Sequence, residues 1–139
     1  MTTLVLLNAA ATWAMVGVIW FVQLVHYPLF AAYAGDGFGR AMADHQRRTF
    51  WVVFPLMMTE LVTSLALLAT PGWLPWVGAA CVGVWGFSTV LVQVPLHGRL
   101  ERDGFDPPTA RRLEQTNWVR TAAWSLHGGL CGGLVASHV

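Results

Sequence analysis

The residues Leu4–Phe30, LVLLNAAATWAMVGVIWFVQLVHYPLF, form an apolar stretch that contains no Asp, Glu, Lys or Arg. A helix needs about 20 mostly apolar residues to cross the roughly 30 Å of hydrocarbon in a bilayer. Three further apolar stretches follow at about 49–68, 74–96 and 118–135. Because helices satisfy their own backbone hydrogen bonds in lipid, the pattern predicts one all-α domain, residues 1–139, built as a four-span membrane bundle.

The composition agrees with a membrane protein and argues against nucleic acid as a partner. Only 11% of the residues are charged and the net charge is +1, whereas soluble domains are about a quarter charged and nucleic-acid-binding domains carry a basic patch. No basic residue precedes the first apolar stretch, which also continues well past Ala9–Ala11. We therefore expect an uncleaved first span rather than a signal peptide.

Arginine is unevenly distributed between the connections. The short segment 69–73 has none, whereas 31–48 and 98–117 together hold seven: Arg40, Arg47, Arg48, Arg99, Arg102, Arg111 and Arg112. By the positive-inside rule the two arginine-rich connections are cytoplasmic. This predicts a multi-pass protein of a bacterial inner (plasma) membrane with both termini on the non-cytoplasmic side. Asp106–Thr109 is typical of a helix start and predicts a short amphipathic helix within the second of these connections.

Polar residues inside the spans fall at two expected depths. Near the cytoplasmic surface lie Gln23, His26, His45, Gln93, His97, Asn117 and Arg120. At a rise of 1.5 Å per residue, Glu60 and His127 both come out near the middle of the membrane. An ionised, unpaired carboxylate at that depth costs about 2.5–3.5 kcal/mol. We therefore expect Glu60 to be protonated, metal-bound or paired, with His127 as its natural partner.

Imidazole and carboxylate are common ligands of iron, copper and zinc, and helix bundles build metal sites from side chains on facing helices. The candidate metal ligands are His26, His45, His97, His127 and Glu60. Alternatively, two histidines such as His26 and His97 would ligate haem b. We assign catalytic roles to Glu60, His127 and Arg120, and cofactor binding to Gln23, Gln93 and Asn117, with Asn117 and Arg120 facing an anionic group.

Two segments of the C-terminal half, VPLHGRL (94–100) and NWVRTAAWSLHGGL (117–130), resemble the end of small four-span bacterial membrane proteins of the anthrone-oxygenase-like group. The matching positions are Pro95, His97, Leu100, Trp124 and His127. The sequence departs from that pattern at His97, where Asn is expected, and after His127, where an Arg is expected. The resemblance implies oxidation of a lipophilic or aromatic substrate within the membrane.

Three functions remain open from the sequence. The first is an oxidoreductase or oxygenase with a histidine-rich metal or haem site in the cytoplasmic half of the bundle, acting on a lipophilic small molecule. The second is a non-catalytic accessory subunit of a larger membrane complex. The third is a proton or small-solute transporter that uses Glu60 and His127. The expected partners are the bilayer and other membrane subunits or further copies of the chain.

Overall fold

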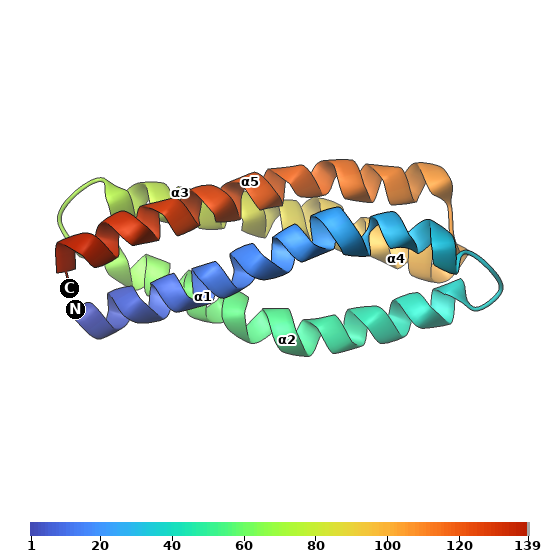
Figure 1. Ribbon diagram of the computed structural model, residues 1–139, viewed down its shortest axis with the longest axis horizontal. Helices are drawn as coiled ribbons and strands as arrows, with labels where there is room; N and C mark the ends of the chain where they lie inside the picture. Colours follow the sequence, from blue (N-terminus) through green and yellow to red (C-terminus); the bar gives the residue numbers. More distant parts are fainter. Residues whose placement is uncertain (139) are drawn as a thin grey trace.

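A computed structural model describes residues 1–138, and every element in that range is helical. Four long rods run side by side, and the two ends of the described chain lie at the same end of the bundle (Figure 1). The elements, with η marking π- and 3₁₀-helical segments, are α1 (Thr2–Phe21), η1 (Val22–His26), η2 (Pro28–Tyr33), α2 (Phe38–Leu67), α3 (Leu74–Ser88), η3 (Thr89–Gln93), α4 (Val94–Asp103) and α5 (Pro107–His138). The third rod is the continuous run α3–η3–α4, and the rod of α1 continues into η1 and η2.

The helices differ from the predicted spans mainly at the arginine-rich end. The prediction of a connection over 31–48 is wrong, because α2 begins at Phe38. Good helix formers fill residues 40–48, so the helix extends beyond its apolar part. The separate amphipathic helix predicted near Asp106 is instead the first part of α5. Its start is confirmed, since Pro107 opens the helix and the Asp106 carboxylate accepts the Thr109 N–H at 3.0 Å.

Two π-helical segments interrupt the rods at corresponding places. The segment η1 precedes Pro28 and η3 precedes Pro95. A proline lacks an N–H, and its ring clashes with the carbonyl four residues earlier in an α-helix. Those carbonyls belong to Leu24 and Leu91, which lie inside η1 and η3. The wider π turn at these two places relieves that clash, and such turns are frequent at functional sites.

Within residues 1–138, three helices are long and apolar enough to cross a membrane: Thr2–His26, Phe38–Leu67 and Leu74–Asp103. The chain thus has the helices of a multi-pass membrane protein, and their apolar surface suits contact with lipid. Large apolar side chains cover the outside, including Trp51, Phe87 and Leu91, which are 67–73% exposed. The fourth rod, α5, is 32 residues long and packs mainly on α1 and α3.

Candidate functional site

Glu60 and His127 form a hydrogen-bonded pair inside the bundle, between α2 and α5. The Nδ1 atom of His127 lies 2.7 Å from Glu60 Oε1, and the indole N–H of Trp124 donates to Oε2 at 2.7 Å. The Glu60 side chain is fully buried. Both carboxylate oxygens therefore have partners, as they must when burial would otherwise cost several kcal/mol. The contact expected from the equal depths of Glu60 and His127 is present in the structure.

Asn8 extends this buried cluster to α1. Its amide nitrogen lies 2.9 Å from both Thr63 Oγ1 and Ser64 Oγ on α2, and its amide oxygen accepts from the Cys131 thiol on α5 at 3.3 Å. Sequence reasoning missed Asn8, although a lone asparagine inside an apolar span is itself a signal. Three helices are joined here by polar contacts that exclude lipid and water.

Gly78, on α3, brings the third rod to the same cluster. A Cβ atom at this position of α3 would lie 2.9 Å from Nε2 of His127. Because the other ring nitrogen is held by Glu60, the imidazole has little freedom to retreat. Gly78 is therefore needed for α3 to pass over the histidine ring. Nothing in the sequence distinguishes it from the other glycines of α3.

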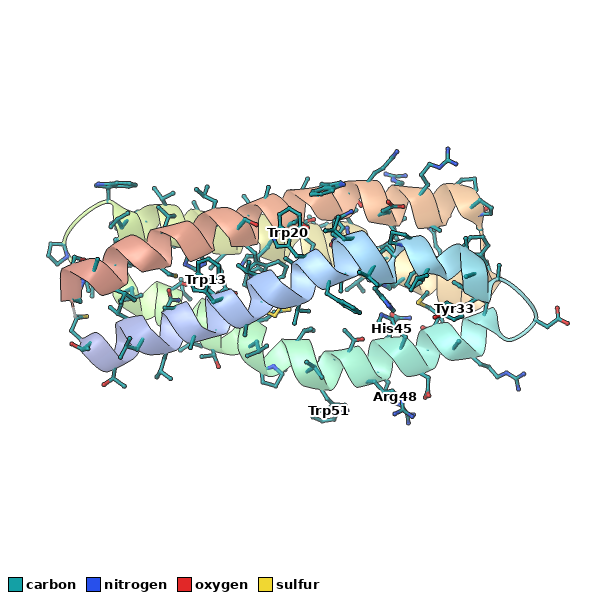
Figure 2. The ribbon with its side chains drawn as sticks, in the orientation of Figure 1. Trp13, Trp20, Tyr33, His45, Arg48 and Trp51 are labelled. Atoms are coloured by element: carbon teal, nitrogen blue, oxygen red, sulfur yellow. The ribbon has the colours of Figure 1, made fainter. Side chains whose placement is uncertain are left out.

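Three histidines gather at the arginine-rich end, each from a different element. His26 of η1 and His45 of α2 face each other with their Nε2 atoms 3.3 Å apart and their ring centroids 4.3 Å apart. The ring of His97, on α4, lies 6.2 Å from that of His45 and nearly parallel to it. In Figure 2, His45 is directed from α2 towards the neighbouring helices, whereas Arg48 and Trp51 point outward.

Hydrogen bonds at Nδ1 orient two of these rings. His97 Nδ1 lies 2.9 Å from the backbone carbonyl oxygen of Gln93, and His45 Nδ1 lies 3.2 Å from Thr49 Oγ1. A carbonyl can only accept, so His97 carries its proton on Nδ1 and keeps a lone pair on Nε2. Metal-binding histidines commonly have this arrangement. The Nε2 atom of His97 lies 3.5 Å from the hydroxyl of Tyr27, a buried residue that sequence reasoning also missed.

The side-chain amides predicted to bind a cofactor form hydrogen bonds within the protein. Asn117 donates to the Gln23 side-chain oxygen at 2.9 Å, and Gln93 donates to Thr116 Oγ1 at 3.0 Å. Both glutamines come from π-helical segments and both bond to α5. Gln23, Gln93 and Asn117 therefore hold α5 against η1 and η3. Gln93 is linked to the histidines through its own carbonyl, which contacts His97, and through Tyr27, whose hydroxyl lies 3.5 Å from Gln93 Oε1.

Arg120 lies between the two polar levels. It is 8% exposed, donates to Asn117 Oδ1 at 3.2 Å and places its guanidinium 5.1 Å from the ring centre of Trp124. Its Nε has no hydrogen-bond partner, and no ion pair involving Arg120 occurs within residues 1–138. The charge of this buried guanidinium is therefore compensated by the aromatic face of Trp124 rather than by a carboxylate.

The five predicted metal ligands do not meet at one point. His26, His45 and His97 form one group, while Glu60 and His127 form another. His45 and Glu60 are 15 residues apart on α2, which corresponds to about 22 Å along the helix. Within the described range 1–138, no group of three or more His, Cys, Asp or Glu side chains is close enough to hold a metal ion.

Comparison with protein-family models, curated proteins and solved structures finds no match to this chain. The function must therefore be inferred from the geometry of the Glu60–His127 cluster and of the group formed by His26, His45 and His97.

Substitution Gly78→Ala should disrupt the Glu60–His127 contact. The added methyl group forces the imidazole to move, and overpacking of this kind costs about 1–3 kcal/mol. Gly83→Ala, on the same helix, is the matched control because its Cβ would meet nothing within 4 Å. Thermal unfolding in detergent, followed by circular dichroism, should show a lower midpoint for Gly78→Ala only. Equal midpoints would contradict the close packing.

Glu60→Leu should destabilise the protein far more than Glu60→Gln. Leucine leaves the N–H groups of Trp124 and His127 buried without acceptors, at about 1–3 kcal/mol each. Glutamine can still accept from the indole through its oxygen and can donate to Nδ1 of the neutral histidine. The same unfolding measurement compares the two variants, and similar midpoints would mean that the buried contacts contribute little.

Proposed function

We propose that the chain crosses a bacterial inner membrane four times, with α5 as the fourth span and both termini on the non-cytoplasmic side. Two observations support this proposal. The helix α5 packs along the apolar rods α1 and α3, and its described end lies beside the start of α1. The arginine-rich connections lie together at the opposite end of the bundle (Figure 1), where the positive-inside rule places the cytoplasm.

Reporter fusions test this topology. Alkaline phosphatase joined after residue 139 should be active and green fluorescent protein at the same site should be dark, because the first requires export and the second requires the cytoplasm. The same reporters inserted at 70–72 should give the same results as the C-terminal fusions. Insertions at 104–106 should give the reverse results. A fluorescent C-terminal fusion would overturn the assigned orientation.

We further propose that His26, His45 and His97 hold a transition-metal ion at the cytoplasmic end of the bundle. The observation that carries this proposal is the 3.3 Å separation of the Nε2 atoms of His26 and His45. Two imidazoles bound to one tetrahedral ion at 2.0–2.1 Å have their nitrogens about 3.3 Å apart. The hydrogen bond at Nδ1 leaves the Nε2 atom of His97 available beside this pair, with its ring 6.2 Å from that of His45.

A haem fits these residues less well. The rings of His26 and His45 are 4.3 Å apart, which leaves no room for a porphyrin between them. A haem held by His26 and His97 would have to share its space with His45, which contacts both rings. We therefore favour a single non-haem iron or copper ion, for which histidine is a suitable ligand.

The reaction that we propose is the oxidation of a lipophilic small molecule. Bound iron or copper would supply the one-electron or oxygen chemistry that amino-acid side chains lack. The protein residues would orient the site: Thr49 and the Gln93 carbonyl fix two imidazoles, and Tyr27 lies beside His97. The resemblance of Pro95, Leu100 and Trp124 to the anthrone-oxygenase-like group supports this class of reaction.

We assign Glu60 and His127 a structural role in this proposal. Both carboxylate oxygens are already bonded, and the pair is about 22 Å along α2 from the histidine group. The catalytic and transport roles predicted for these residues from the sequence would require a proton or solute to reach a fully buried carboxylate.

Metal analysis of the purified protein tests the proposed ion. The unaltered chain should carry about one iron or copper ion, and His45→Ala should lose it because it removes a ligand and leaves one of the facing pair. His138→Ala is the matched control, since the imidazole of His138 lies near Ser137 Oγ and the Leu134 carbonyl of its own helix and not near the three histidines. Emission spectrometry gives the stoichiometry, and electron paramagnetic resonance reports nitrogen ligation. Metal retained in His45→Ala would contradict the assignment, and metal-free unaltered protein would favour the accessory-subunit function.

A further inference from the structure

A cavity of about 160 Å³ lies beside the histidine group, between η2 and the start of α5. Its walls are mainly apolar and include Tyr27, Phe30, Phe105 and Ala110. For comparison, an enclosed apolar cavity of about 150 Å³ in another protein accepts benzene, whereas the space here is partly open to the outside. The space therefore suits a molecule with a body of about one six-membered ring.

The cavity and the histidine group share a wall. Tyr27 and Phe30 line the cavity, and their other sides contact the imidazoles. The ring of Phe30 stands edge-on to His26 at 4.9 Å, and the ring of Tyr27 lies 5.7 Å from that of His97. Both side chains are about 95% buried. A molecule in the cavity would thus be one aromatic side chain away from the proposed ligands.

Two charged side chains, Arg111 and Glu114 of α5, also line the cavity. Within residues 1–138 neither side chain takes part in an ion pair or a side-chain hydrogen bond. One is a donor and the other an acceptor, and together they are electrically neutral. This arrangement suits an uncharged group that both donates and accepts, such as a hydroxyl, rather than a carboxylate or an ammonium group.

We propose that this cavity binds a compact, uncharged alcohol, with its apolar body against Phe30 and Phe105 and its hydroxyl group near Arg111 and Glu114. The inference rests on the proposed function in one respect, since it makes the cavity the substrate site of the histidine group. The binding itself depends only on the cavity, so the two proposals can fail separately.

Cyclohexanol is a suitable probe because it has one ring and one hydroxyl group. Binding is measured by saturation-transfer NMR on the full chain in nanodiscs. Ala110→Leu and Ala31→Leu fill the cavity from its two sides and should each weaken binding by about tenfold or more, which corresponds to about 1.4 kcal/mol. Ala122→Leu is the matched control, because Ala122 is an exposed residue of α5 outside the cavity. Uptake of the probe by lipid is the same for all variants, so the difference between them reports the cavity.

Metal content is determined on the same samples to separate the two proposals. Binding that is lost in both cavity variants but kept in Ala122→Leu supports the cavity site, whether or not metal is present. Equal binding by all variants, or no binding by the unaltered chain, overturns the cavity site even if metal is bound. Cyclohexanol binding without metal would retain the cavity and reject the proposed metal function.

Discussion

The Glu60 carboxylate, bonded to Trp124 and His127, is the contact on which the arrangement of the helices depends. Packing of apolar faces alone specifies helix register weakly in lipid, where the surroundings are as apolar as the interface. Polar contacts restrict the register, because sliding α2 or α5 would leave the carboxylate of Glu60 or the N–H groups of Trp124 and His127 without a partner. Asn8 and Gly78 add α1 and α3 to the same point. All four rods are thus aligned at one level.

This alignment also positions the histidine group. His45 and Glu60 are separated by 15 residues of α2, or slightly more than four turns, so their side chains point within about 60° of each other. Fixing Glu60 towards α5 therefore also turns His45 into the bundle. Pro55 lies between them, and the helix continues through it. Near the start of α2, where His45 lies, the wider turns of η1 and η3 bring His26 and His97 to the level of His45. One buried contact and two proline-dependent π segments together account for the approach of three imidazoles that are far apart in the sequence.

Much of this could be predicted from residue type and position. Long apolar stretches with few charges predict the long helices, and equal depth predicts that Glu60 meets His127. The extent of the helices could not be predicted in this way, because hydropathy reports the lipid boundary and not the end of hydrogen bonding at Phe38 or Asp103. The division of the five candidate ligands into two groups follows the two depths expected from the sequence. Which imidazoles face each other depends on helix rotation, which the π segments change. Gly78 matters only because the imidazole ring of His127 packs directly against it.

Arg120 shows how the two polar levels are electrostatically connected. A buried guanidinium is costly unless its charge is compensated, yet its contacts here are the amide of Asn117 and the face of Trp124. The edge of the same indole donates to Glu60. Donation to a carboxylate draws positive charge to the N–H edge and leaves the ring face more negative, which favours a cation above it. Trp124 thus stands between a carboxylate and a guanidinium that do not touch. Removing the carboxylate should weaken the hold on Arg120, and with it the contacts of Asn117 and Gln23 that position the histidine end of the bundle.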